Sequence, residues 1–183
     1  TSDEHPWFQS SRELSSPWRD WYIWRPAREG HEPGTPGAEP TNAGCFFSGP
    51  GWQFDPASGQ YYLHLFSPKQ PDLNWENPAV RQAVYEMMRW WVERGVDGFR
   101  MDVINLISKT YPLVDGVVNG PDGLSYDPTP AVEGPRLHEF LREMNREVGL
   151  SAKDLFSVGE MILVDAETAR SHTDPDAGEL GMV

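Results

Sequence analysis

The stretch VDGFRMDV, at residues 96–103, decides the fold class of this chain. It follows Gly95, which ends a helical pattern, and its apolar and alternating residues predict a β-strand from Val96 to Val103. Side chains alternate between the two faces of a strand, so Arg100 and Asp102 share one face and apolar side chains occupy the other. A cation and an anion therefore stand together near the end of a predicted strand.

A helical pattern precedes this strand. Asn77 is typical of an N-cap, Pro78 suits the first helical position, and Gly95 suits the end of the helix. Apolar residues recur between these signals at helical spacing: Val80, Val84, Met87, Met88 and Trp91. We expect this stripe to pack in the core, because an apolar stripe on a helix usually faces the interior.

The same order of elements recurs further along the chain. An apolar helical stripe follows Pro135 and stops at Gly149, and a second strand is predicted over 155–158. Two successive units of helix and strand indicate a parallel sheet and an α/β fold class. The second strand runs into Glu160, so it also leads to a carboxylate.

The two carboxylates suggest acid–base chemistry. Asp102 and Glu160 would meet at one rim, because neighbouring parallel strands lie about 4.8 Å apart and end at the same edge. Retaining glycosidases hold two carboxyl groups about 5–5.5 Å apart. We expect Arg100 to keep Asp102 ionised, since an adjacent cation favours the charged form. A structural ion pair is the alternative interpretation, although burying such a pair is costly. The pattern alone favours a barrel enzyme and names no substrate.

The segment before residue 77 has a different character. Residues 1–76 are rich in proline, glycine and aromatic side chains and show no sustained helical period. Within them, Trp52–Asp55 and Gln60–Phe66 flank a short turn and predict a β-hairpin. Further on, the connection over 104–134 is far longer than the roughly 2–6 residues usual after a strand, which favours a functional loop.

Composition excludes several classes of protein. A hydrophobic content of 38% is enough for a folded core, and a net charge of −13 argues against a nucleic-acid surface. No run of about 18 apolar residues predicts a membrane span. The single cysteine, Cys45, allows no intrachain disulfide and is expected to be a small buried thiol. Nothing requires an oxidising compartment, so we expect a cytoplasmic protein, and the start at Thr1 suggests a fragment of a longer one.

The run DGFRMDVIN at 97–105 resembles the nucleophile segment of the α-amylase superfamily, glycoside hydrolase family 13, in its oligo-1,6-glucosidase and α-glucosidase branch. Further segments agree in order with the same branch: TSDEHPWF at 1–8, DWYIWR at 20–25, QPDLNW at 70–75, GPRLHEF at 134–140 and VGEM at 158–161. The resemblance covers essentially the whole chain.

The resemblance implies a fold and three catalytic roles. The fold would be a partial TIM (β/α)8 barrel with an irregular, β-containing subdomain. Residues 1–76 would be that subdomain, inserted after the third barrel strand, and residues 77–183 would run from barrel helix 3 to just beyond strand 5. Asp102 would form the covalent glucosyl-enzyme, Arg100 would orient it, and Glu160 would be the general acid/base.

The resemblance also implies substrate-binding residues. Phe47, Phe66 and Gln70 would line the pocket near the nucleophile, although the two aromatic rings could instead fill the subdomain core. Val103, directly after the nucleophile, is similar to the family variant that prefers α-1,6 bonds, whereas threonine there accompanies α-1,4 preference.

We therefore expect a retaining α-glucosidase acting on terminal, mainly α-1,6, bonds of short α-glucoside oligosaccharides. A sucrose isomerase or transglucosylase of the same superfamily is one alternative, and a non-catalytic sugar-binding relative is another. No nucleic acid or membrane partner is expected. No cofactor is expected, and a calcium loop known in part of the family would lie outside this chain, so no metal ligand is predicted here.

Other family residues would lie outside these 183 positions. The substrate-binding Asn-His pair would precede Thr1, and the third catalytic aspartate would follow Val183. None of the five histidines matches a catalytic position, and we expect His138 and His172 on solvated faces. A complete barrel needs about 250 residues. The isolated 183 residues are therefore expected to expose apolar helix faces and to be inactive or prone to aggregate.

Overall fold

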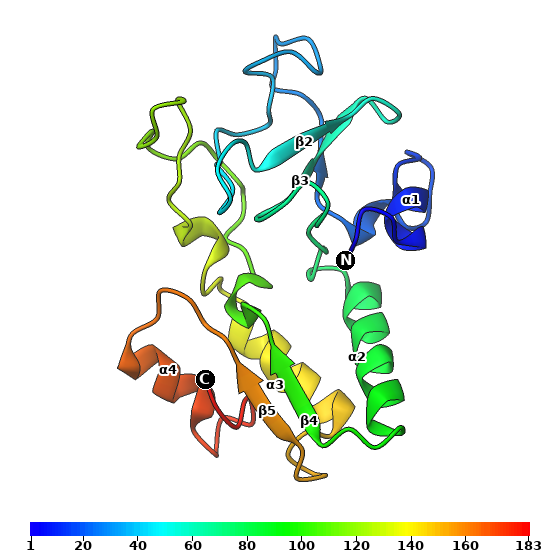
Figure 1. The fold of residues 1–183 in the computed structure, drawn as a ribbon, viewed down its shortest axis with the longest axis vertical. Helices are drawn as coiled ribbons and strands as arrows, with labels where there is room; N and C mark the ends of the chain where they lie inside the picture. The colour runs from blue at the N-terminus through cyan, green and yellow to red at the C-terminus, as the bar shows by residue number, and fades with distance from the viewer. The chain divides into compact units, whose positions relative to one another are not determined.

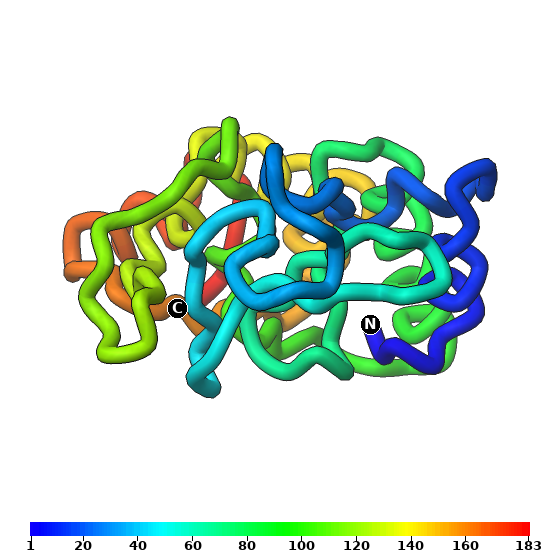
Figure 2. The backbone as a smooth tube through the Cα atoms, turned by 90° about the horizontal axis from the view of Figure 1, so that it is seen from above, coloured from blue at the N-terminus to red at the C-terminus, as the bar shows by residue number.

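The computed structural model describes residues 1–183 and divides into two units, each treated separately below (Figures 1 and 2). The first unit comprises Thr1–Asn77 together with Tyr111–Pro128. The second comprises Pro78–Thr110 together with Thr129–Val183. The chain thus leaves the second unit after its first strand, returns to the first unit, and enters the second again.

The loop Tyr111–Pro128 belongs to the first unit, whereas the predicted division into residues 1–76 and 77–183 placed it in the second part. In the structure its backbone pairs with the first unit, where the N–H of Ser125 donates to the carbonyl of Asn42 at 2.8 Å. Such pairing between segments distant in sequence leaves no local signal. The interpretation of the two parts as an inserted subdomain and a piece of barrel stays a prediction.

The first unit is built on a small antiparallel sheet. Its strands are β1 (Trp24–Arg25), β2 (Trp52–Asp55) and β3 (Gln60–Leu63), in the order β1-β3-β2. The predicted hairpin is confirmed as β2 and β3, although β3 ends at Leu63 rather than at Phe66. Two short helices accompany the sheet: α1 (Pro6–Ser11) and η1 (Arg19–Trp21).

Both faces of this sheet are covered, which explains the aromatic content of the segment. Tyr61 and Tyr62 are adjacent in β3 and therefore point to opposite faces. Tyr61 packs on one face with Ile23, Ala38, Trp52 and Leu63. Tyr62 packs on the other with Phe8, Tyr22 and Trp24. Cys45 is buried and unpaired, as expected for a small buried thiol.

The second unit contains the parallel pair β4 (Gly98–Met101) and β5 (Phe156–Gly159), side by side in Figure 1. The two strands approach closely at Gly98, where a Cβ atom would lie 1.9 Å from the carbonyl oxygen of Phe156. Only glycine fits there. β4 is shorter than the predicted Val96–Val103, and β5 begins and ends one residue later than the predicted 155–158.

Helices follow the sequence signals more closely. α2 (Pro78–Val92) begins at the predicted proline, and α3 (Leu137–Val148) ends at Gly149, which takes the left-handed conformation with φ 79°. Residues of α3 at helical spacing are fully buried, among them Leu137, Phe140, Leu141, Met144 and Val148. The remaining short elements are η2 (Ile104–Leu106), η3 (Thr129–Ala131) and α4 (Ala166–Thr173).

The apolar stripe of α2 is only partly buried. Met88 is 4% exposed, but Met87 and Trp91 are 48% and 45% exposed, so the prediction that these two pack in the core is wrong in this structure. The buried face of α2 is instead formed by Val80, Arg81, Tyr85 and Met88. Met87 and Trp91 lie off that face. The predicted apolar stripe is wider than the part of a helix that one neighbouring element can cover, so some of its members stay exposed.

The parallel sheet is open, not a closed barrel. Met182 forms an isolated parallel bridge with Val158 of β5, and the N–H of Gly159 donates to the Met182 carbonyl at 2.9 Å. β5 is therefore flanked on both sides. No helix of the chain combines the length and apolar character needed to cross a membrane.

Candidate active site

The pairing of β4 with β5 brings the two predicted catalytic carboxylates level with each other. Met101 lies opposite Gly159 in the register, so Asp102 and Glu160 each follow the last paired position of their strand. The backbone ladder continues past the strands, since the N–H of Glu160 donates to Met101 at 2.9 Å and that of Ile104 to Glu160 at 3.0 Å. The two carboxylates thus share one rim, as the sequence predicted.

Arg100 joins both carboxylates. One guanidinium nitrogen, Nη1, hydrogen-bonds Asp102 Oδ1, and the other, Nη2, donates to Glu160 Oε2 at 2.8 Å. The hydrogen bond that Arg100 donates to Asp102 is the main reason why the pKa of Arg100 is raised, and the charge of Glu160 adds to it. The Asp102 side chain is 74% exposed here, so its attraction to Arg100 is screened by solvent. The planar fork fixes geometry more than it adds stability.

Val103 adopts a strained backbone next to the pair. Its φ of 39° and ψ of 46° lie in the left-handed region, which a β-branched residue rarely occupies. Such strain costs on the order of 1–3 kcal/mol and is concentrated at functional sites. The conformation turns the Val103 N–H toward Glu160 Oε2, at 3.3 Å. One oxygen of Glu160 therefore accepts from both Arg100 and the Val103 backbone.

Phe47 and Phe66, two of the predicted substrate-binding residues, lie together in the first unit. Their ring centroids are 5.6 Å apart in an edge-to-face arrangement, and both line a cavity of about 270 Å³. Phe47 is 67% exposed, so it does not fill the subdomain core. Gln70 lies outside that lining, where its Oε1 accepts from the Ser67 N–H at 3.3 Å. Whether these three residues approach the nucleophile stays a prediction.

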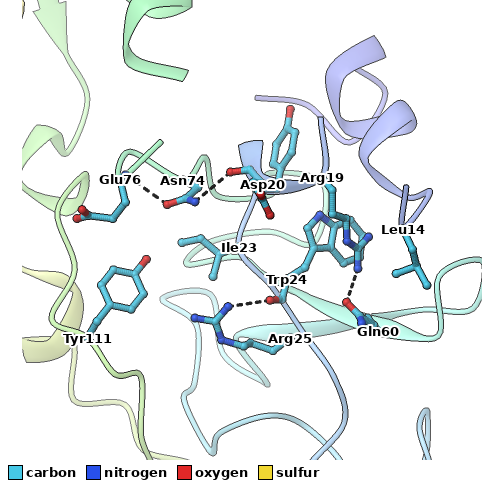
Figure 3. Close-up of a pocket in the computed structure, with 11 residues that line it drawn as sticks. Leu14, Arg19, Asp20, Ile23, Trp24, Arg25, Gln60, Asn74, Glu76 and Tyr111 are labelled. Atoms are coloured by element: carbon cyan, nitrogen blue, oxygen red, sulfur yellow. Dashed lines mark hydrogen bonds between the residues drawn. The ribbon is translucent and has the colours of Figure 1, made fainter. Parts of the chain in front are cut away.

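A separate cavity of about 500 Å³ in the first unit contains none of the predicted site residues (Figure 3). Several of its polar side chains are engaged with neighbours: Arg19 hydrogen-bonds Gln60, and Asn74 donates to the Asp20 carbonyl at 3.0 Å. The ring of Trp24 has Arg19 over it at 3.8 Å and Phe8 stacked against it at 5.6 Å. Both neighbours cover that ring, so it offers little surface for stacking against a sugar.

His172 corrects the expectation of a solvated histidine. It is fully buried, with Nδ1 2.8 Å from Glu179 Oε2 and Nε2 2.8 Å from Glu133 Oε2. His138 is partly buried and stacks on His172, with ring centroids 4.4 Å apart. Its Nδ1 contacts the same carboxylate, Glu179, at 2.8 Å. Nothing in the spacing of these residues along the chain indicates the cluster.

The donor atoms of His138, His172 and Glu179 all lie within 4.8 Å of one another, which is close enough for a shared metal ion. The surroundings fit an ion-pair cluster better. Arg142 directs Nη1 at Glu179 Oε1, 3.3 Å away, and a guanidinium beside the central ligand repels a cation. His172 also has both ring nitrogens on carboxylates, which is the pattern of an imidazolium rather than of a neutral ligand.

Asn105 is a site residue that the sequence did not single out. It is fully buried in η2, three residues after Asp102. Its Nδ2 donates to the carbonyl of Ile162 at 2.9 Å, and its Oδ1 accepts from the Ile162 N–H at 3.3 Å. The only available signal is its place at the end of the nucleophile segment, and its partner lies 57 residues away.

The chain is similar to several proteins of known family. The family model described as "Alpha amylase, catalytic domain" matches residues 1–183. The oligo-1,6-glucosidase of Parageobacillus thermoglucosidasius is 53% identical over 184 residues, which cover 100% of this chain and 31% of that protein. The chain thus spans about a third of the length of this relative.

Two solved structures have the same fold over nearly the whole chain. The trehalose-6-phosphate hydrolase of Bacillus licheniformis superposes with a TM-score of 0.87 at 46% identity, covering 98% of this chain and 30% of that one. The isomaltulose synthase of Erwinia rhapontici NX5 gives a TM-score of 0.85 at 40% identity, with 98% and 30% covered.

Proposed function

The chain belongs to the α-amylase family, and on this premise we propose that the protein carrying it is a retaining α-glucosidase. In this proposal it hydrolyses terminal α-glucosidic bonds of short oligosaccharides, chiefly α-1,6 bonds, by double displacement. The observation that carries the proposal is the contact of Arg100 with both Asp102 and Glu160 at the end of two neighbouring parallel strands.

In the first step, an oxygen of Asp102 forms a bond to the anomeric carbon while the bond to the leaving oxygen breaks. Glu160 gives its proton to that oxygen, so an alcohol departs and a covalent glucosyl-enzyme remains. Arg100 and the Val103 N–H both contact Oε2 of Glu160, which leaves Oε1 to carry the proton.

In the second step, Glu160 takes a proton from water, whose oxygen bonds to the anomeric carbon as the bond to Asp102 breaks. Two inversions at the same carbon retain the α configuration. Arg100 supports both steps, because it stays beside the carboxylate that is alternately free and esterified, and its fixed charge needs no reorganisation.

Substrate choice is proposed to depend on residues beside and beyond the carboxylates. Val103 lies directly after Asp102 and would favour α-1,6 bonds, while Phe47, Phe66 and Gln70 would contact the sugar. The exposed ring of Phe47 supports a contact role, since a core residue would be covered. The name of the relative from Parageobacillus thermoglucosidasius, an oligo-1,6-glucosidase, is consistent with this choice.

Asp102→Asn in the complete protein tests the proposal, with release of 4-nitrophenol from its α-glucoside as the assay. Loss of the nucleophile should lower kcat by on the order of 10⁴-fold. Asp97→Asn is the matched control, because Asp97 lies on the same segment and only its backbone carbonyl has a role there, accepting from Phe156 at 2.8 Å. Near-normal activity of Asp102→Asn would overturn the proposal.

A sucrose isomerase or transglucosylase is the second candidate, favoured by the structural likeness to an isomaltulose synthase. It would form the same glucosyl-enzyme but pass the glucose to a sugar hydroxyl instead of water. Incubation with sucrose separates the two, because hydrolysis yields free glucose and fructose whereas isomerisation yields a new disaccharide. A non-catalytic sugar-binding role is less favoured, since both carboxylates are present and held by one arginine.

A further inference from the structure

Asn105 binds the backbone of the segment that follows Glu160. Its carboxamide makes a reciprocal pair of hydrogen bonds with the peptide of Ile162, donating at 2.9 Å and accepting at 3.3 Å. Ile162 is two residues after Glu160, and Asn105 is three residues after Asp102. One side chain from the nucleophile segment therefore fixes the main chain of the acid/base segment.

This contact continues a series of bonds between the two segments. The Glu160 N–H donates to Met101, and the Glu160 carbonyl accepts from the Ile104 N–H at 3.0 Å. Both polar groups of the Glu160 backbone are thus held by residues that flank Asp102. The Asn105 contact to Ile162 extends the pairing beyond the end of the strands, where regular ladder bonds stop.

The position of Asn105 is itself fixed from a third direction. The backbone carbonyl of Asn105 accepts from the N–H of Glu133 at 3.1 Å, and the side chain of Glu133 in turn contacts buried His172. Asn105 is fully buried, so losing its carboxamide would leave two backbone groups of Ile162 without a partner. The segment carrying Glu160 would then be free to shift.

We propose that Asn105 is a positioning residue, which sets the location of Glu160 relative to Asp102 by holding the peptide of Ile162. The inference rests on the proposed function and assigns Asn105 no contact with substrate. A displaced acid lowers the rate most where the leaving group needs a proton, and a misplacement of about 1 Å costs on the order of 10²-fold.

The test compares two substrates in the complete protein. Isomaltose has a sugar leaving group that needs protonation, whereas 4-nitrophenyl α-glucoside has a leaving group that departs with little help. Asn105→Ala should lower kcat/KM on isomaltose by on the order of 10²-fold. The loss of kcat/KM on the aryl glucoside should be smaller than this by a factor of about ten or more. Asn105→Asp, which keeps the shape but places an oxygen opposite the Ile162 carbonyl, should show the same imbalance and serves if the alanine variant does not fold.

Asn145→Ala is the matched control. Asn145 is also buried, at 8% exposed, and its Nδ2 donates to Ser151 Oγ and to the Glu179 carbonyl, both at 2.8 Å. It contacts neither carboxylate segment. The control should lower the thermal midpoint but leave the ratio of kcat/KM for the two substrates unchanged.

The outcomes separate this inference from the proposed function. An active parent that loses activity with Asp102→Asn, but whose Asn105 variants lose both substrates equally or neither, would overturn the inference alone. A shift in the ratio for Asn145→Ala as large as that for Asn105→Ala would do the same. A parent with no α-glucosidase activity would remove both.

Discussion

His172 Nδ1 lies 2.8 Å from Glu179 Oε2, and both side chains are excluded from solvent. The other ring nitrogen contacts Glu133 Oε2 at the same distance, so the ring donates to a carboxylate on each side. Burial lowers the pKa of His172, but the hydrogen bonds that the ring donates to Glu179 and Glu133 outweigh it and raise the pKa overall. A buried imidazolium therefore joins α4 to Glu133, 39 residues earlier in the chain, and to Glu179, seven residues after it.

The stability of the complete protein should depend on this charge. A histidine whose pKa is raised by folding stabilises the folded state fully below its unfolded pKa of about 6.5. This stabilisation is lost as the pH rises through the pKa of the folded state. We expect the free energy of unfolding, from urea titrations between pH 6 and 9, to fall with rising pH more in the parent than in His172→Asn. His31→Asn, which removes an exposed histidine, should keep the parental slope. Parallel curves for the parent and His172→Asn would contradict the assignment.

Arg100→Lys should lower kcat by on the order of 10²–10³-fold with a smaller change in KM. A lysine keeps the charge but lacks the planar fork that holds two carboxylates at once. Steady-state rates with an aryl α-glucoside measure the effect. Arg94→Lys is the control, because Arg94 lies over the ring of Trp90 away from the pair. A rise in KM at constant kcat would mean that Arg100 serves only binding.

Gly98→Ala should destabilise the protein strongly. The added Cβ would lie 1.9 Å from the Phe156 carbonyl oxygen, and that contact is backbone that cannot rotate away. We expect a loss at or above the upper end of the roughly 1–3 kcal/mol typical of overpacking. Gly59→Ala meets nothing within 4 Å and is strained only by its φ of 68°, so it should cost about 1 kcal/mol. Equal losses in urea unfolding would show that the β4–β5 approach tolerates a methyl group.

Val103→Thr should move the preference of the enzyme toward α-1,4 bonds. Threonine is also β-branched, so the left-handed backbone at this position keeps a comparable strain. We expect the ratio of kcat/KM for maltose over isomaltose to rise roughly tenfold. Initial rates on the two disaccharides give this ratio. A proportional fall on both would place the effect of Val103 in its backbone and not in its side chain.

Local signals predicted the elements that depend on local physics. Pro78 and Gly149 mark helix ends by their restricted or permissive backbone, and alternation placed Arg100 and Asp102 on one face. The meeting of Asp102 with Glu160 was also predictable, because parallel strands end at a common edge. Each of these inferences needs only a few neighbouring residues or a general rule of topology.

The features that sequence reasoning missed all depend on contacts between distant residues. Burial of His172 requires Glu133 and Glu179, and the role of Asn105 requires Ile162. The exposure of Met87 depends on which helices lie beside α2, and no periodicity within α2 contains that information. Spacing along one chain cannot reveal which partner a buried polar group will find.

The register that pairs Gly98 with Phe156 also bears on the order in which the chain folds. The hairpin of β2 and β3 closes a loop of a few residues, whereas β4 and β5 can pair only after the 54-residue connection over 102–155 has been drawn together. The entropic cost of closing a loop rises with the length of the loop, and parallel pairing across a long connection is slow. The rim that holds both carboxylates should therefore form late, after the hairpin, so catalytic competence would follow compaction and not accompany it.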